Sequence, residues 1–378
     1  MDKPDPVDIP RTATQRARAP RSAEELRRWQ AGNPEPVLEP GIPIIDPHHH
    51  LWDRPGHPYL LPEFLADAGC GHDIRATVFV ECGAMYRASG PAEMKPVGET
   101  EFVSGMAAMS ASGLYGPTAV CAGIVSFADL TLGPAVQEVL DAHVAAGGGR
   151  LRGIRHQSAH DESLHWEKQK PKGLLRDARL RAGLARLVPM GLVFDAWVYF
   201  TQLGDVADLA RSSPGTPIVL NHLGGVLGVG AHEGRLGEEF SVWKCGMKNL
   251  ATCENVVVKV GGLGMLKAGL GAALRETPAS SCELAASWRP YVETCIEMFG
   301  AERCMFESDF PPDKQSCSYS VLWNAFKRLA SSSSTSEKTA LFHDTAARVY
   351  QLPPAQQLSA LPAASPVTGK SGDPASHR

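Results

Sequence analysis

The stretch IPIIDPHHH, residues 42–50, joins a short apolar run to three consecutive histidines. Side chains of a β-strand alternate between its two faces, so a strand here predicts that Asp46, His48 and His50 project together. His49 then points the other way. Two imidazoles from one strand end, beside a carboxylate, can hold a divalent metal or polarise a substrate carbonyl. The alternative is a polar turn, which a spaced pair of histidines after a β-rich run disfavours.

Seven further apolar or β-branched runs follow, each of the length of a buried parallel strand. The eight expected strands cover residues 42–46, 76–81, 120–125, 151–155, 192–198, 217–221, 256–260 and 304–307. Helix-like segments lie between them, at residues 97–109, 134–146, 180–188, 203–211, 240–251, 283–299 and 336–350. Eight βα units predict an α/β protein of the (β/α)₈ TIM-barrel type with loop insertions, whose active site gathers at the carboxyl ends of the strands. A doubly wound open sheet is disfavoured because no glycine-rich nucleotide-binding motif follows any strand.

Polar residues recur where the expected strands end, as a barrel enzyme requires. They are Glu81, Arg155, His156, Asn221, His222, Lys259, Glu307 and Asp309. An arginine can bind a planar carboxylate through two nitrogens, a histidine can polarise a carbonyl, and an aspartate can accept a proton from water. Arg155, His222 and Asp309 are therefore candidates for chemistry. For Glu81, His156 and Lys259, a structural role in ion pairing or strand capping is as consistent with the sequence as a functional one, because buried charges are normally paired.

The composition indicates a soluble globular protein, with 378 residues, 43% hydrophobic and 21% charged. The formal net charge of −4 gives no basic surface for nucleic acid or an anionic membrane. Nine cysteines without metal-binding spacing are typical of reduced, mostly buried thiols. The chain also lacks the apolar stretch of a signal peptide or a membrane span. We expect a cytoplasmic protein that acts on a small molecule. The sequence is consistent with either a monomer or a homo-oligomer.

Both ends of the chain differ in composition from the expected barrel. An arginine-rich cluster at residues 11–28 and a proline-containing segment at 34–40 predict a solvated N-terminal arm and linker over residues 1–40. Residues 353–378 are rich in Pro, Ala, Ser and Gly and are expected to form a disordered tail. The barrel is then expected over residues 41–352.

Three long loops are expected to select the substrate, because barrel loops carry function. They cover residues 86–99, 157–172 and 224–235. The middle loop contains His160, His165, Trp166, Lys168 and Lys170, whose positive charges mildly favour an acidic substrate.

Five motifs, in this order, resemble the amidohydrolase-2 family of TIM-barrel hydrolases. They are DPHHHLWD (46–53), GIR (153–155), LNHLGG (220–225), ESDFP (307–311) and TAARVY (345–350). The resemblance covers residues 42–352 and is nearest to a branch with sugar lactonases, sulfomuconolactonase-type enzymes and 2-pyrone-4,6-dicarboxylate lactonase. It implies hydrolysis of a carbon–oxygen or carbon–nitrogen bond, most often in a lactone ring.

The resemblance also implies roles for individual residues. It places His48 and His50 at the first-strand histidine pair, Arg155 at the substrate-binding arginine, His222 at the sixth-strand histidine and Asp309 at the catalytic aspartate. The expected substrate-binding set adds Glu81, Tyr199 and His156.

The fifth strand departs from the pattern that many amidohydrolases share. These relatives have a further histidine metal ligand there, whereas residues 191–200 offer only Asp195, Trp197 and Tyr199. His48, His50 and Asp309 could still supply three ligands to a divalent metal, with zinc the expected ion. Catalysis without metal, in which the histidines polarise the carbonyl directly, is the alternative.

The expected mechanism is the opening of a sugar or a muconate- or pyrone-type lactone by water. Asp309 takes a proton from the water, while His48, His50 and His222 stabilise the oxyanion and Arg155 anchors a substrate carboxylate. One alternative is a metal-dependent decarboxylase or hydratase of an aromatic or muconate-like acid. Another is a non-catalytic ligand-binding barrel, which a scatter of these side chains would favour.

Overall fold

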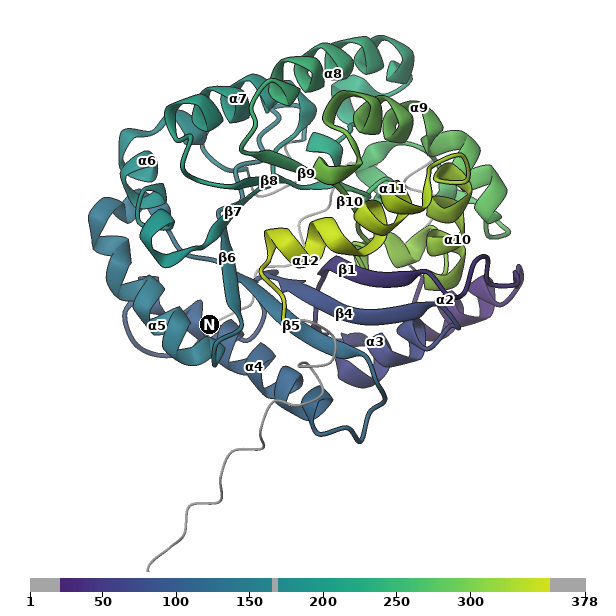
Figure 1. Ribbon diagram of the computed structural model, residues 1–378, viewed down its shortest axis with the longest axis horizontal. Helices are drawn as coiled ribbons and strands as arrows, with labels where there is room; N and C mark the ends of the chain where they lie inside the picture. The colour runs from purple at the N-terminus through teal and green to yellow at the C-terminus, as the bar shows by residue number, and fades with distance from the viewer. Residues whose placement is uncertain (1–20, 165–168, 354–378) are drawn as a thin grey trace, which may run out of the picture.

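The structure is a computed structural model that describes residues 21–164 and 169–353, and its centre is a barrel of eight parallel strands (Figure 1). The strands follow one another around the barrel in chain order. They are β1 Pro43–His49, β4 Asp73–Val80, β5 Ala119–Ser126, β6 Leu151–Arg155, β7 Val193–Ala196, β8 Ile218–Leu220, β9 Val256–Val260 and β10 Cys304–Phe306. Such strands are buried on both faces, which explains their nearly continuous apolar sequences. The predicted (β/α)₈ barrel and all eight expected strands are confirmed.

Helices surround the strands in Figure 1, and most of them occupy the expected intervals. Their bounds are α3 Leu61–Ala68, α4 Val97–Ala111, α5 Gln137–Gly147, α6 Ala178–Leu184, α7 Leu203–Ser212, α8 Leu236–Ala251, α9 Ser281–Phe299, α10 Tyr319–Leu329, α11 Thr335–Thr339 and α12 Thr345–Val349. Helices α3 and α10 were not expected from the sequence. A small antiparallel hairpin after β1, formed by β2 Trp52–Arg54 and β3 His57–Tyr59, was not expected either.

The first and last strands close the barrel at their carboxyl ends. The His50 N–H group donates to the Phe310 carbonyl over 2.8 Å, and the Asp309 N–H group donates to the His48 carbonyl over 2.9 Å. These two backbone bonds place the first-strand histidines directly beside the residues that follow β10.

Strand β1 does not keep a strict alternation of faces. Asp46 pairs with Thr77 and His49 with Phe79, so β1 has one extra residue in this interval, as in a β-bulge. Asp46 therefore turns toward the outer helices, where its Oδ2 accepts a hydrogen bond from the Tyr319 hydroxyl of α10 over 2.9 Å. The expectation that Asp46 shares a face with His48 is wrong, because period-two alternation ignores the bulge.

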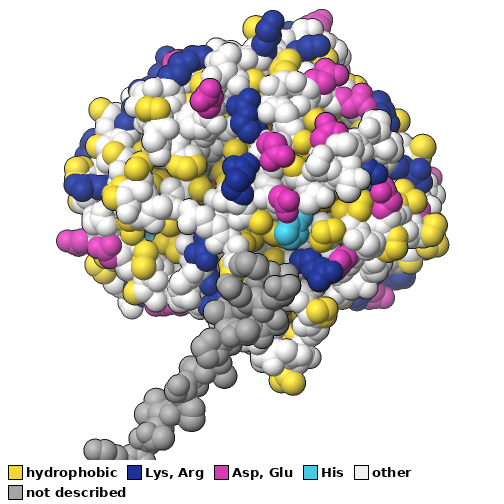
Figure 2. Space-filling view, viewed as in Figure 1, with side chains coloured by type: hydrophobic (Ala, Val, Ile, Leu, Met, Phe, Trp, Pro, Cys, Tyr) yellow, Lys and Arg dark blue, Asp and Glu magenta, His cyan; other side chains and the backbone are white. Residues whose placement is uncertain are grey.

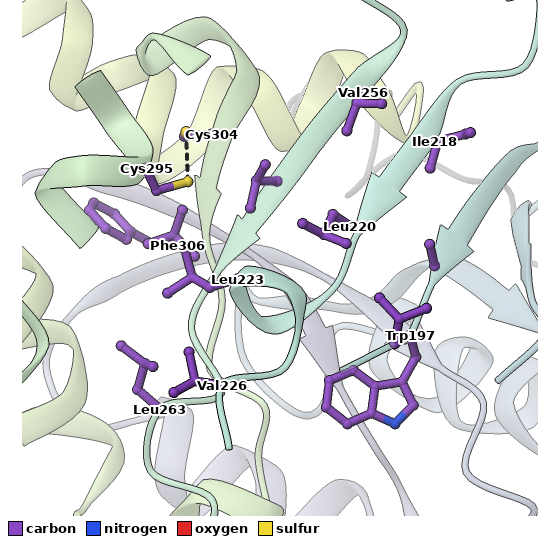
Figure 3. Close-up of a cluster of buried hydrophobic side chains, with 14 of the residues drawn as sticks. Trp197, Ile218, Leu220, Leu223, Val226, Val256, Leu263, Cys295, Cys304 and Phe306 are labelled. Carbon is purple, nitrogen blue, oxygen red and sulfur yellow. Dashed lines mark hydrogen bonds between the residues drawn. The ribbon is translucent and has the colours of Figure 1, made fainter. Parts of the chain in front are cut away.

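Two hydrophobic layers hold the strands in place. Inside the barrel, Ile45, Val78 and Val193 pack with Tyr350, which follows α12 at the C-terminal end of the described chain. Outside it, Figure 3 shows Ile218 and other strand residues packed toward the helices. The Cys295 and Cys304 sulfurs lie 3.9 Å apart in this outer layer. All nine cysteines are free thiols, and most are buried.

The N-terminal segment contains a further helix, α2 Ala23–Gln30. Residues 21–40 belong to the expected solvated arm and linker, but Leu26 of α2 is only 5% exposed and packs against the rest of the protein. The other expected arm residues, 1–20, lie outside the described residues, as do 354–378 of the expected tail and His165, Trp166 and Lys168 of the middle loop.

The molecular surface seen in Figure 2 mixes charges of both signs, with Lys and Arg interspersed among Asp and Glu. Within residues 21–164 and 169–353, no helix has the length and apolar character needed to cross a membrane.

Candidate active site

Three imidazoles converge on one carboxylate at the carboxyl ends of the strands. Asp309 Oδ1 lies 3.8 Å from His48 Nε2, 3.4 Å from His50 Nε2 and 3.7 Å from His222 Nε2. All four side chains are buried, with at most 5% exposure. The structure therefore brings together the four residues that the sequence analysis expects to act in catalysis.

Neighbouring groups set the orientation of each imidazole by occupying its Nδ1 atom. His50 Nδ1 lies 2.7 Å from the Val80 carbonyl, and His222 Nδ1 lies 2.7 Å from Glu307 Oε1. His48 Nδ1 lies 2.9 Å from Glu307 Oε2 and 3.3 Å from Lys259 Nζ. Since each Nδ1 is engaged, each Nε2 is directed at Asp309, as is usual for histidines that act through one nitrogen.

The backbone adopts unusual conformations at two of these residues. His222 and Asp309 have positive φ angles of 53° and 52°, a region that non-glycine residues seldom occupy. Gly262, in the loop after β9, also has a positive φ, and a Cβ there would lie 2.6 Å from His222 Nδ1. Strained residues of this kind cluster at functional sites, where the surrounding structure holds them in place.

The charges at the centre suit a base beside neutral imidazoles. Burial raises the pKa of Asp309, but His222, the hydrogen bond with His50 and Arg155 together lower the pKa below its ordinary value. Burial lowers the pKa of His48 well below its usual range, and the Lys259 charge adds to this effect. Burial also lowers the pKa of His50. At neutral pH, Asp309 is therefore ionised, whereas His48 and His50 are neutral.

Arg155 and Glu81 lie at the same end of the barrel and form a buried ion pair. The Arg155 Nε–H group donates to Glu81 Oε1 over 2.7 Å, and its Nη2 donates to the Glu81 carbonyl. Gln157 Nε2 also donates to Glu81 Oε1, over 2.7 Å. Arg155 Nη1 lies 3.4 Å from His48 Nε2 and so faces the centre of the site. Nη1 also donates to Asn221 Oδ1 over 3.5 Å, so all three guanidinium nitrogens have partners within the protein.

Two other expected substrate-binding residues lie apart from this centre. His156 Nδ1 accepts a hydrogen bond from the Leu130 N–H group, and its ring packs against Phe127. The Tyr199 hydroxyl lies 3.4 Å from Lys267 Nζ, and its ring packs against Trp197. Trp197 in turn lies 4.7 Å from the His222 ring, so Tyr199 borders the cluster through Trp197.

A buried polar group beneath the histidines was missed by the sequence analysis as part of the site. Asp195 of β7 accepts hydrogen bonds from Lys259 Nζ over 2.7 Å, Asn221 Nδ2 over 2.9 Å and the Tyr350 hydroxyl over 2.9 Å. The fifth strand of the barrel, β7, thus carries a carboxylate paired with lysine at the strand where the resemblance implies a histidine ligand in many relatives. Glu307, which the sequence places at the end of the last strand without a role, bonds His222. Inward-facing charge in apolar strands is the signal that could have identified both residues.

The donor atoms at the centre fit a divalent metal. His48, His50 and Asp309 each offer a ligand atom within 4.8 Å of the others, and so do His48, His222 and Glu307. Asp309 Oδ2 and Asp313 Oδ1 are both buried, and burial together with the nearby Asp309 carboxylate raises the pKa of Asp313, so negative charge gathers at this point. Imidazole nitrogens and a carboxylate oxygen are ligands that zinc prefers at catalytic sites.

The amidohydrolase family profile matches residues 45–352, so the chain belongs to the amidohydrolase family. The protein is therefore an enzyme of the amidohydrolase superfamily, in which a divalent metal commonly serves catalysis.

Three relatives place the chain within this family. An uncharacterised protein of Sinorhizobium fredii is 33% identical over 82% of this chain and 99% of its own length. An L-fucono-1,5-lactonase of Burkholderia multivorans is 30% identical over 54% of this chain and 64% of its own length. The crystal structure of a B. multivorans amidohydrolase with bound zinc superposes with a TM-score of 0.62 at 26% identity, covering 82% of this chain and 99% of that one.

Proposed function

We propose that this protein hydrolyses the ester bond of a lactone. The observation that carries the proposal is the convergence of three imidazole Nε2 atoms on the ionised carboxylate of Asp309. This arrangement combines a base for water with imidazole nitrogens whose lone pairs would hold a divalent metal beside the substrate carbonyl.

The reaction follows from the positions of these groups. Asp309 accepts a proton from water, and the resulting hydroxide attacks the lactone carbonyl. His48, His50 and His222 surround the position where the oxyanion develops. The carbon–oxygen bond of the ring then breaks, and the proton held by Asp309 passes to the departing ring oxygen. The product is one open-chain hydroxy acid, so no further reactant is needed.

A divalent metal, which we propose to be zinc, would be held by His48, His50 and Asp309 and would act as a Lewis acid toward the carbonyl. Arg155 stays in the proposal as a substrate-binding residue with a narrower role. Glu81 engages Nε and Nη2, so only Nη1 is directed at the centre. We expect this nitrogen to contact a substrate oxygen rather than to bind a carboxylate through two parallel bonds.

A sugar-acid lactone is the substrate class that we favour. The support is the 30% identity to an L-fucono-1,5-lactonase, which extends over 54% of this chain. Specificity resides in the loops of such barrels, so the individual sugar depends on residues outside the shared centre.

The decisive experiment is a lactone panel with three arms: sugar-acid lactones, pyrone or muconate-type lactones, and linear esters. Each is assayed by acid release before and after treatment with a chelator, and after the addition of zinc. We expect sugar-acid lactones to be opened fastest. In a parallel assay with aromatic acids, release of CO₂ without lactone opening in the panel would instead identify a decarboxylase.

His49→Ala is the matched control for substitutions of the neighbouring histidines. His49 lies on the outer side of β1, where its ring packs 4.4 Å from Phe64 and its Nε2 lies 2.8 Å from Thr77 Oγ1. We therefore expect His49→Ala to retain turnover below its unfolding temperature, whereas His50→Ala loses it. Equal losses in both variants would contradict the proposed assignment of faces.

A further inference from the structure

The N-terminal segment, residues 21–39, lies outside the region that matches the amidohydrolase family, which begins at residue 45. It contains α2, at the periphery of the barrel in Figure 1. Ser22 and Glu25 form a capping box at the start of this helix, and the side chain of Leu26 anchors it. The helix is thus well formed, although it precedes the region that matches the family.

The polar side chains of this segment bind the loop that follows β9. Arg21 Nη1 donates to the Ala273 carbonyl over 3.0 Å, and Trp29 Nε1 donates to the Glu276 carbonyl over 2.9 Å. Glu35 accepts a hydrogen bond from the Ser281 N–H group over 2.6 Å, at the start of α9. Because these bonds satisfy backbone groups of an irregular loop, they restrict its conformations.

The same segment binds the loop that follows β10. Gln30 Nε2 donates to the carbonyls of Lys314 and Cys317, over 2.8 and 2.9 Å. The backbone of Arg21 exchanges two hydrogen bonds with the Gln315 side chain, each 3.2 Å long. One short segment therefore connects two loops that come from neighbouring strands.

These two loops meet directly beside Asp309. The Gly264 N–H group, after β9, donates to Asp313 Oδ2 over 2.9 Å, and the Ser316 hydroxyl donates to the Gly264 carbonyl. The Asp313 N–H group in turn donates to the Asp309 carbonyl over 3.1 Å. A Cβ at position 264 would lie 2.8 Å from Asp313 Oδ2, so this junction requires glycine. The bonded path thus runs from α2, through the turn at 312–315, to the backbone of Asp309.

A second anchor fixes the far end of the segment. The buried Lys327 of α10 donates from Nζ to the carbonyls of Leu38 and Glu39, over 2.8 and 2.9 Å. The Leu38 N–H group donates to Asn324 Oδ1 over 2.9 Å. The segment is therefore held at both ends and cannot move away from the loops as a free arm would.

We propose that residues 21–39 form an intramolecular brace that holds the loops after β9 and β10 together and thereby positions Asp309. The brace residues are positioning residues, because none of them touches the imidazole cluster. The proposed brace limits the mobility of the two loops. It does not depend on which substrate the enzyme hydrolyses.

The test compares two double variants of the full-length protein by hydrogen–deuterium exchange. Trp29→Ala with Gln30→Ala removes three bonds from the brace to the loops. Arg27→Ala with Arg28→Ala alters two exposed side chains of the same helix and serves as the control. We expect the backbone amides of residues 264–281 and 310–318 to exchange about tenfold faster in the first variant. A change of about tenfold is the size expected when one to two hydrogen bonds are replaced by bonds to water. The barrel strands and the control should exchange as in the wild type.

Turnover provides a second readout. We expect the brace variant to lower kcat more than it raises KM, because misplacement of Asp309 affects the chemical step. Unchanged exchange in both loops, or a uniform increase across the barrel, would overturn the brace proposal. Faster exchange of the loops in a protein that opens no lactone would instead support the brace and reject the proposed function.

Discussion

At the scale of single residues, Asp309 carries the proposed chemistry. Asp309→Asn removes the base but keeps the size of the side chain, so we expect kcat to fall by about 10²- to 10⁴-fold. Circular dichroism and the unfolding temperature should show a folded protein. Steady-state assays on the best lactone of the panel measure the effect. A variant that kept full turnover would show that another group activates water.

The contribution of His72 to stability depends on pH in a direction that the structure fixes. Burial and the neighbouring Lys327 lower the pKa of His72 to about 4. In the unfolded chain the pKa of histidine is about 6.5, so the folded state favours the neutral ring. The contribution of His72 to the free energy of unfolding is therefore complete above pH about 6.5. It is lost as the pH falls toward about 4, and the loss is at most about 3 kcal/mol.

Urea unfolding of the wild type and His72→Gln checks this expectation. The wild type should lose more stability than the variant between pH about 7 and pH about 4, because glutamine does not titrate. Parallel losses in the two proteins would mean that other groups govern the acid sensitivity.

The sequence predicted the residues at the centre better than those that support them. His48, His50, His222 and Asp309 lie in short motifs at strand ends, where a barrel places its chemistry. Asp195 and Lys259 were not recognised as a pair because they come from different strands, and their 2.7 Å contact depends on the closed barrel. The orientation of Asp46 could not be predicted because a one-residue bulge leaves no pattern in the sequence.

At the scale of elements, the loop after β9 shapes the site through Gly262. Gly262→Ala would place a Cβ 2.6 Å from His222 Nδ1 and displace the ring. A displacement of about 1 Å can reduce turnover by about 10²-fold, so we expect a loss of this size. Gly271→Ala is the matched control, because Gly271 also has a positive φ but has no atom within 4 Å of the added Cβ.

Both glycine variants should share a loss of stability of about 1 kcal/mol, because alanine is strained at a positive φ, and the overlap with His222 adds a further loss of about 1–3 kcal/mol in Gly262→Ala. Thermal unfolding measures this shared cost, and turnover separates the two variants. If Gly271→Ala lost as much activity as Gly262→Ala, general strain in the loop rather than contact with His222 would explain the effect.

At the scale of the whole molecule, the eight strands were predictable because each is a short apolar run, as expected of parallel strands that are buried on both faces. The brace was not predictable from composition. Its arginines and prolines resemble those of a solvated arm, and its order comes from side chains that bind carbonyls about 250 residues further along the chain, as for Trp29 and Glu276. Local sequence does not reveal such distant contacts, so the composition of residues 21–39 predicted a solvated arm rather than a packed segment.

Metal binding links the site to the stability of the whole barrel. If zinc binds the folded centre and not the unfolded chain, a free concentration about 100 times Kd should stabilise the protein by about 3 kcal/mol and raise the unfolding temperature by several degrees. We expect a chelator to abolish this increase and His50→Ala to remove it, while His49→Ala retains it, because His49 lies on the outer side of β1. Differential scanning calorimetry of the three proteins, each with and without zinc, measures the effect without any substrate. An equal zinc response in the wild type and His50→Ala would place the metal elsewhere and would leave the imidazoles to act on the carbonyl directly.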